Sequence, residues 1–513
     1  MLTVLPILIP LTAAALCVAC WGRVRAHRSI AVLAMLAHLV VSIALLTTVR
    51  ENGILHVDLG GWEAPVGITF VADNFACLMN LLTSIVGLAA VVSSCFSTDD
   101  RRARLGHFPL CLALLGAVCG AFLTGDLFNL YVWFELLLLS SFVLLTLGGD
   151  RAQLEGAVKY VTLNLVSSVL FLAAVGLIYG FTGTLNMADL ALKLDQLDPA
   201  KATMIAAPTL VGFAIKGGVF PFFFWLPASY HTPPPVVSAL FAGLLTKVGV
   251  YAIIRSCTLM FDQEQQVVGN VILVFAGLTM VTGVIGAIAQ SDMRRILAFH
   301  IVSQIGYMLM GLGVAMTAAA QGLPDEVVAL ALSGAVFYIL HHIIVKTNLF
   351  LVAGVVVHEY GSSELAKVDG IVSKRPFLAA LFLVSALSLA GIPILSGFWA
   401  KVALVRGGLE AGSYPIVIVS LGVSLFTLFS MMKIWTQGFW GEASPLSDEP
   451  LSPGRARGLL FPIVCLAAIT VSIGLGASPA IDFAIETATQ LLEQDAYIDA
   501  VLPGRPGAEV TTP

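Results

Sequence analysis

The sequence predicts an all-α polytopic membrane protein, and its composition and its apolar runs are the reasons. Of the 513 residues, 58% are hydrophobic and only 11% are charged, whereas a soluble globular chain carries roughly 25% charged residues. The mean hydropathy is +0.96. The apolar residues form long continuous runs and do not alternate with polar ones, which favours helices over a membrane barrel. This composition excludes a soluble enzyme, a disordered chain and a disulfide scaffold.

A transmembrane helix needs about 20 mostly apolar residues, and by that rule we expect about fourteen spans. They cover approximately residues 1–21, 28–49, 68–96, 107–124, 126–147, 155–182, 202–225, 234–257, 267–289, 294–316, 327–357, 377–405, 413–437 and 457–478. The N-terminus lacks a positively charged region, so we interpret it as the first span and not as a cleaved signal.

Loop charge predicts the orientation. Fourteen Lys and Arg residues lie in or beside the odd-numbered loops, against six in the even-numbered loops and the C-terminal tail. Positive charge marks the cytoplasmic side, so both termini are expected on the external side of a bacterial plasma membrane. The segment 479–513 carries six acids and one base and would form an acidic external tail.

Neither composition nor motifs indicate a cofactor. The eight cysteines are scattered, and Cys17 and Cys20 form their C-x-x-C inside an apolar helix, where a thiol behaves as a small hydrophobe. We recognise no nucleotide-binding loop, haem pair or iron–sulfur cluster, and no basic face for a nucleic acid.

Six lysines fall within the expected spans: Lys159, Lys216, Lys247, Lys346, Lys401 and Lys433. Lys159 and Lys433 lie near span ends and can extend to the membrane interface. The other four are deeper, where a lysine costs about 2.5–3.5 kcal/mol on insertion scales, and this favours a functional role over structural pairing. One acid, Glu135, lies well inside an apolar run, and a buried lysine is its expected counter-charge. Asp126, nearer the span end, is expected to be a helix N-cap.

Two spans are predicted to break near a buried lysine. In VGFAIKGGVFPFFFWLP, Gly217, Gly218 and Pro221 follow Lys216, and Pro221 removes a helical hydrogen bond. In SLAGIPILSGFWAK, Gly391 and Pro393 precede Lys401. Broken spans expose backbone groups that line a cavity or pack in protein, and they mark ion sites in many transporters.

Two further spans carry polar stripes at helical spacing. His300, Ser303, Gln304 and Tyr307 share one face, and Tyr338, His342 and Lys346 share another, with His341 beside them. Interhelical hydrogen bonding alone is one interpretation. A proton path is favoured because His and Lys change protonation, and a metal site is disfavoured because adjacent histidines on a helix point about 100° apart.

These segments resemble the antiporter-like subunits shared by respiratory complex I and the multisubunit Mrp-type cation/proton antiporters. The resemblance rests on TGDLFNLYVWFELLLLSSFVLL, AIKGGVFPFFFWLP, SYHTPPPVVSALFAGLLTKVGVY, SDMRRILAFHIVSQIGYM, FYILHHIIVKTNLFL and LSLAGIPILSGFWAK. GDLFNLYVWFE resembles the D-type group of Mrp subunits more than the complex I subunits. The resemblance implies two inverted five-helix repeats. The corresponding domains are 1–106, three N-terminal helices; 107–257, the first repeat; 258–437, the second; and 438–513, the last helix and tail.

The resemblance also implies roles for individual residues. Glu135, Lys216, Lys247 and Lys401 match the family's polar axis, and His300, His341, His342 and Lys346 would connect its parts. The implied function is proton translocation within a Na⁺/H⁺ antiporter, beside other Mrp-type subunits. Movement of Glu135 relative to Lys216 would switch proton uptake and release.

Three alternatives stay open at this stage. The chain could serve a complex I-like or hydrogenase-linked proton pump, act as a stand-alone permease, or have only a structural role, with inert polar residues. Its buried ionisable residues are spread over many helices, which argues against a single permease pocket. Co-purifying partners would separate the first alternative, and transport assays the last.

Overall fold

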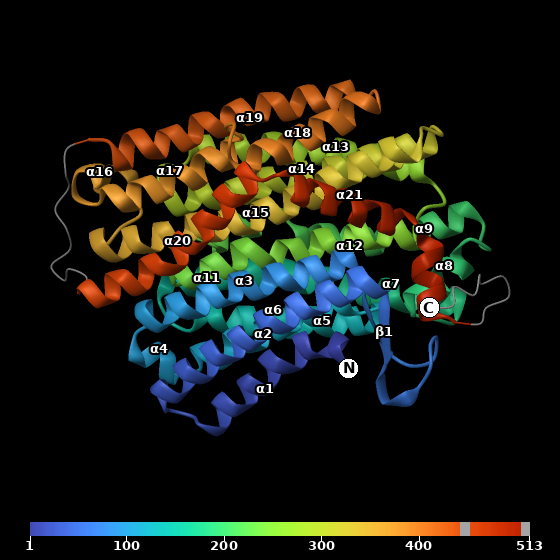
Figure 1. Cartoon of the computed structure of the whole chain (residues 1–513), viewed down its shortest axis with the longest axis horizontal. Coiled ribbons are helices and arrows are strands. Elements are labelled where there is room, and N and C mark those ends of the chain that lie inside the picture. The colour runs from blue at the N-terminus through green and yellow to red at the C-terminus, as the bar shows by residue number, and fades with distance from the viewer. Residues whose placement is uncertain (442–451, 504–513) are drawn as a thin grey trace.

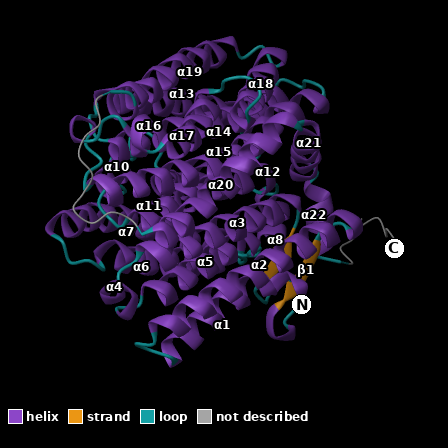
Figure 2. Ribbon diagram, turned by 60° about the vertical axis from the view of Figure 1, so that its left-hand side comes forward, coloured by secondary structure: helices purple, strands orange, loops and turns teal. Residues whose placement is uncertain are grey.

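The computed structural model describes residues 1–441 and 452–503, and it confirms the all-α membrane class. Long helices run side by side in one bundle (Figure 1). The N-terminal part comprises α1 (Leu5–Ala19), α2 (Val24–Asn52), α3 (Asn74–Ser97) and the short α4 (Asp100–Arg104). Between α2 and α3, strands β1 (Leu55–Asp58) and β2 (Thr69–Ala72) pair antiparallel, with Leu55 opposite Ala72. They lie at the end of the bundle where α1 begins (Figure 2).

The next group of helices contains the first broken span. It comprises α5 (His107–Leu123), α6 (Leu127–Thr146), α7 (Arg151–Thr182), α8 (Met187–Leu194), α9 (Pro199–Gly217), α10 (Trp225–Ser229), α11 (Pro235–Leu240) and α12 (Thr246–Leu259). A π-helical turn, Phe241–Leu245, joins α11 to α12. The Asp126 carboxylate accepts a hydrogen bond from the Asn129 backbone at 2.7 Å, so the predicted N-cap of α6 is confirmed.

The remaining helices contain the second broken span. They are α13 (Gln265–Ala289), α14 (Met293–Ala320), α15 (Asp325–Tyr360), α16 (Ile371–Lys374), α17 (Pro376–Ala390), α18 (Ser396–Glu410), α19 (Tyr414–Ile434), α20 (Pro453–Leu475), α21 (Ser478–Leu492) and α22 (Gln494–Val501). A second π-helical turn, Trp435–Phe439, extends α19.

Burial differs sharply between the centre and the edge of the bundle. The 235–259 segment and helices α14 and α15 are almost wholly buried, whereas α2, α7 and α13 expose many large apolar side chains. Such an exposed apolar surface suits a bilayer, which hides it from water. The titratable residues of interest lie mainly on the central helices.

Within the described residues, eleven helices are long and apolar enough to cross a membrane. Three of the expected spans are not among them. Helix α5 has only 17 residues, 202–225 is interrupted after Gly217, and 377–405 is interrupted between α17 and α18. The number fourteen therefore stays a prediction.

The C-terminal region is more ordered than a simple tail. Residues 478–501 form α21 and α22, and α21 packs against α15, α12 and α3. The apolar residues of α21 recur at helical spacing, so Ala484, Ala488 and Leu491 are buried on one face. Arg505 and Glu509, which contribute to the predicted charge of the tail, lie outside the described residues.

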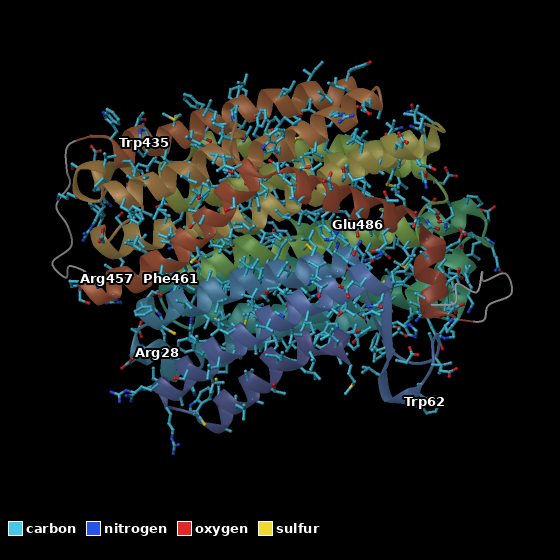
Figure 3. The ribbon with its side chains drawn as sticks, in the orientation of Figure 1. Arg28, Trp62, Trp435, Arg457, Phe461 and Glu486 are labelled. Atoms are coloured by element: carbon cyan, nitrogen blue, oxygen red, sulfur yellow. The ribbon has the colours of Figure 1, made fainter. Side chains whose placement is uncertain are left out.

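The two ends of the bundle differ in their side chains. The start of α1 and the end of α22 lie at one end (Figure 1), together with Trp62 and Glu486. Arg28 and Arg457 lie at the opposite end (Figure 3).

Candidate proton-transfer axis

The first helix break follows Lys216 directly, as the sequence predicted. Gly218 has a φ of +72°, a left-handed conformation that ends α9, and Pro221 lies in the connection to α10. The Trp225 indole donates a hydrogen bond to the Ile215 carbonyl at 3.0 Å, and the Thr279 hydroxyl accepts one from the Phe220 backbone at 3.0 Å. The exposed backbone groups of this break are therefore partly satisfied by neighbouring side chains.

Lys216 is buried among apolar and neutral polar groups. Its Nζ donates a hydrogen bond to Ser168 Oγ on α7 at 3.3 Å and lies 5.1 Å from the centre of the Phe134 ring on α6. An aromatic face attracts a cation through its quadrupole. This pocket can therefore hold the charged amine without a direct ion pair.

Glu135 follows Phe134 on α6, and the structure does not pair it with a lysine. No ion pair joins it to a cation within 4.0 Å among the described residues, and its buried Oε1 has no hydrogen-bond partner. The Glu135 and Lys216 charges interact only through the intervening space. The expected counter-charge is therefore nearby, but out of contact.

Lys247 lies in the first turn of α12, the helix that follows the π-helical turn. Its Nζ donates to the Ala242 carbonyl at 2.6 Å and to Thr246 Oγ1 at 3.3 Å, and the side chain is fully buried. A π turn shifts the backbone hydrogen-bond register and often occurs at functional sites. Here it directs a carbonyl of the turn toward the amine. Helix α12 also packs closely on the first break, because Gly249 lies against the backbone of Gly217.

The two polar stripes face each other across α14 and α15. Lys346 Nζ donates to the Leu297 carbonyl of α14 at 3.0 Å, and the Tyr338 hydroxyl donates to the Gln304 side chain. The rings of Tyr338 and Tyr307 stack, with centres 5.1 Å apart. These contacts include the interhelical hydrogen bonds expected from the bundle-stabilising interpretation.

The histidines are different, because several of their ring nitrogens have no protein partner. Both nitrogens of His342, one of His341 and one of His300 are buried and unpaired. The other His300 nitrogen lies 2.5 Å from Ser430 Oγ on α19. Such unpaired nitrogens are uncommon, since buried polar atoms are almost always hydrogen-bonded.

The second break surrounds Lys401. Gly391 has a φ of +89° and ends α17, and Pro393 lies in the connection to α18. Lys401 Nζ reaches back across the break and donates to the Ala390 carbonyl at 2.8 Å and to Ser424 Oγ at 2.7 Å. It also lies 5.3 Å from the centre of the Tyr307 ring. The break thus supplies an acceptor for the buried amine.

A short serine relay joins the second break to α15. His341 Nδ1 lies 2.8 Å from Ser396 Oγ, which lies 3.1 Å from Ser388 Oγ. Ser388 Oγ in turn accepts a hydrogen bond from the Gly397 backbone at 3.2 Å. Helix α15 is thereby coupled to both halves of the broken span.

Apart from Glu135 on α6, the predicted site residues lie on helices in mutual contact, α9 with α12, α14 with α12 and α15, and α15 with α18. We call these residues the row. His342 interacts electrostatically with Lys247, Lys346, His341 and His300, and His300 interacts with Lys346 and Lys401. Lys216 joins this row through the α9–α12 contact, and no direct contact links its amine to Lys247.

Sequence reasoning missed several polar residues that the fold brings to the site or to the helices beside it. Ser424 and Ser430 provide partners to Lys401 and His300 from α19, which has the composition of an ordinary apolar span. Arg255 forms a buried ion pair with Asp73, joining α12 to the start of α3. A charged residue in the apolar run 234–257 was the signal for Arg255.

The fold and the buried amines define a class: helical membrane proteins with two broken helices, each bearing a buried lysine. The profile of the family described as "NADH:quinone oxidoreductase/Mrp antiporter, TM" matches residues 124–427, more than half of the chain. The chain therefore belongs to this family.

Full-length comparisons place the chain beside the D-type antiporter subunits. It is 45% identical over 502 residues to a protein of Alkalihalophilus pseudofirmus that is named as the D-type subunit of a Na(+)/H(+) antiporter, with 98% of this chain and 99% of the relative covered. A chain in the solved Mrp complex from Dietzia sp. DQ12-45-1b is 32% identical, with a TM-score of 0.89, covering 98% of this chain and 99% of that one. A chain of respiratory complex I from Thermus thermophilus is 23% identical with a TM-score of 0.79, covering 95% and 99%, and this likeness shows the fold alone.

Proposed function

We propose that this chain is the proton-translocating subunit of a multisubunit Na⁺/H⁺ antiporter and thus part of a transporter, not an enzyme. One observation carries the proposal: buried titratable side chains lie in a row between two broken helices, each of which bears a buried lysine. The 45% identical relative is named as part of a Na(+)/H(+) antiporter, and this supports the cation exchange. The likeness to a chain of the Mrp complex supports partner subunits of the same kind.

Proton transfer in this scheme depends on amines that can exchange protons with water. A carboxylate stabilises a nearby ammonium, so a movement of Glu135 toward or away from Lys216 changes the proton affinity of that amine. The change passes to Lys247, then along the His300 and His342–Lys346 stripes, and then to Lys401. Each displaced charge repels the next, because Coulomb interactions are strong where little water screens them.

The separation of Glu135 from Lys216 supports a switching role. Two charges more than 4 Å apart interact by at most about 4 kcal/mol at an effective dielectric constant near 20. A small change in their distance therefore alters the interaction by an amount comparable to one or two pKa units, each about 1.36 kcal/mol. A tight ion pair would instead keep Lys216 protonated and Glu135 ionised, so small movements would change the proton affinity of Lys216 less.

The orientation follows from charge asymmetry. The end that carries Arg28 and Arg457 faces the cytoplasm of a bacterial cell, and the start of α1 and the end of α22 face outward (Figure 3). Protons and Na⁺ are then exchanged across the plasma membrane. This chain carries the protons, and the whole complex provides the path for Na⁺.

The test compares single variants in everted vesicles with matched amounts of assembled complex. Lys216→Ala and Glu135→Ala should each lower Na⁺-driven proton exchange at least tenfold. Lys201→Ala is the matched control, because Lys201 is exposed in the first turn of the same helix, α9. Undiminished exchange in Lys216→Ala, or an equal loss in Lys201→Ala, would contradict the proposed role.

The complex I-like alternative has a specific observation in its favour, because the family and the fold are shared with respiratory complexes. Purification of the particle separates the two functions. Small membrane subunits alone support the antiporter, whereas quinone-reducing or hydrogenase subunits support the alternative.

A further inference from the structure

A cavity at the Arg28 end of the bundle lies outside the lysine row. It has a volume of about 400 Å³, within the range of roughly 300–1,000 Å³ that is usual for small-molecule sites. Helix α10 contributes one wall, α7 a second, and the α13–α14 turn a third. The same turn pairs with residues 363–365, just before α16, and α16 marks this end in Figure 1.

The polar wall of this cavity has more positive than negative charge. Lys159 and Arg295 line it, together with one carboxylate, Glu155, which lies 2.6 Å from the Lys159 amine. The Arg295 guanidinium is exposed, and no hydrogen bond or ion pair to it is found among the described residues. His231 also lines the cavity and adds no charge near neutral pH, because burial and the nearby Arg295 lower its pKa to about 4.

Aromatic side chains also line this cavity, and one of them is exposed at the protein surface. Phe223, Phe224 and Phe299 line it, and Phe224 is 55% exposed. Val158, the residue before Lys159 on α7, is 65% exposed and adds an apolar side chain to the surface near the cavity. A ligand with an anionic head and an apolar tail matches this combination of basic and aromatic side chains.

We propose that this cavity binds the headgroup of an anionic phospholipid, with its phosphate between Lys159 and Arg295 and its acyl chains along Phe224 and Val158. Basic pockets between membrane helices on the cytoplasmic side favour such headgroups. The guanidinium supplies donors in a planar fork that suits phosphate oxygens.

The position of the site gives the lipid a structural role. Helix α10 is the short helix after the break at Lys216, and it packs between α7 and α14. Gly156 allows the close approach of α7, since a Cβ there would lie 2.8 Å from Thr232 Oγ1. A phosphate bound to cations of both α7 and α14 would connect the two helices across α10. The lipid would thereby hold the first helix break in place, and this inference does not depend on the transported ion.

The test measures the anionic lipid that stays with the whole complex, purified in mild detergent, by mass spectrometry. Each basic residue strengthens such binding about fivefold. The double variant Lys159→Gln/Arg295→Gln should therefore retain phosphatidylglycerol about twenty-fold less well. The matched control is Arg101→Gln/Arg104→Gln, which removes two exposed charges from the loop of the same predicted side. Equal retention in all three proteins, or an equal loss in both variants, would overturn the site.

Two further experiments test whether the loss of lipid reflects misfolding, and whether the site binds phosphate in general and not a lipid. Glu155→Gln frees Lys159 and should increase retention about fivefold, a gain that an unfolded variant does not give. Inorganic phosphate is then added to the wild-type complex at the phosphate concentration of phosphatidylglycerol vesicles. Lipid-specific protection against thermal unfolding supports the proposal, and equal protection by inorganic phosphate overturns the lipid assignment.

Discussion

The substitution Gly391→Ala tests the geometry of the second break without changing any charge. An added Cβ at this position would lie 2.7 Å from Lys401 Cδ and 3.3 Å from its Nζ, closer than side-chain atoms normally approach. The lysine must therefore move away from the break. In the unaltered protein the Lys401 amine donates hydrogen bonds to the Ala390 carbonyl at 2.8 Å and to Ser424 Oγ at 2.7 Å. The displacement in Gly391→Ala weakens one or both of these bonds.

The expected loss follows from the strength of these bonds. A hydrogen bond from a charged group contributes roughly 1.5–3 kcal/mol, and each 1.36 kcal/mol corresponds to a tenfold change in rate. If Lys401 relays protons, loss of one hydrogen bond from its amine should therefore lower the exchange rate roughly ten- to hundred-fold. The left-handed backbone adds about 1–2 kcal/mol of strain, which affects stability.

Gly412→Ala is the matched control for the strain. Gly412 has a φ of +67°, yet nothing lies within 4 Å of an added Cβ. Both variants are assayed for Na⁺-driven pH change in vesicles that contain equal amounts of complex. The control should stay within about threefold of the wild type, since it disturbs no proton carrier. Equal rates for the two variants would refute the reasoning about Lys401.

Three further predictions address the packing and the charges around the row. Gly249→Ala places a Cβ 2.5 Å from the Gly217 backbone nitrogen, so α12 and α9 must separate and exchange should fall at least tenfold in vesicles with normal complex content. Asp73→Asn leaves the Arg255 guanidinium buried without its counter-charge, which should cost about 3–5 kcal/mol and lower the melting temperature of the purified complex; an unchanged melting temperature would contradict this. His231 has its pKa lowered to about 4 by burial and by Arg295, so the unfolded chain binds a proton between about pH 6.5 and 4 that the folded chain does not. Stability should therefore fall by at most about 2 kcal/mol as the pH drops from 7 to 5, and His231→Gln should show a smaller drop in thermal stability over the same range.

Much of the architecture could be predicted because a bilayer requires long apolar helices, which are recognisable in the sequence. A long apolar run is a span, and Gly391 or Pro221 within one marks a break, because the helix loses conformational restraint or a hydrogen bond there. Lysines within such runs were recognised as candidate functional residues, because inserting a lysine into a membrane span costs free energy. The class of antiporter-like proteins followed from motifs that surround these residues.

The remaining features depend on packing that the sequence does not display. The π turn before Lys247 lies in FAGLL, which has no distinctive pattern. The separation of Glu135 from Lys216 is set by how α6 and α9 meet. Ser424 looks like any serine in an apolar helix until the fold brings it to Lys401. The sequence likewise shows that α21 is amphipathic, but only the fold shows that its apolar face packs on α15.

The most direct test of the proton row is a measurement on Lys346 at its centre. The purified complex is reconstituted into liposomes with a trapped pH-sensitive dye, and a Na⁺ gradient is imposed. Lys346→Met keeps the length of the side chain and removes a fully buried titratable amine. Lys193→Met is the control, because it removes a half-exposed amine that forms an ion pair with Asp189. The row predicts that Na⁺ drives a pH change with wild type and Lys193→Met but not with Lys346→Met. A full pH change with Lys346→Met would contradict it.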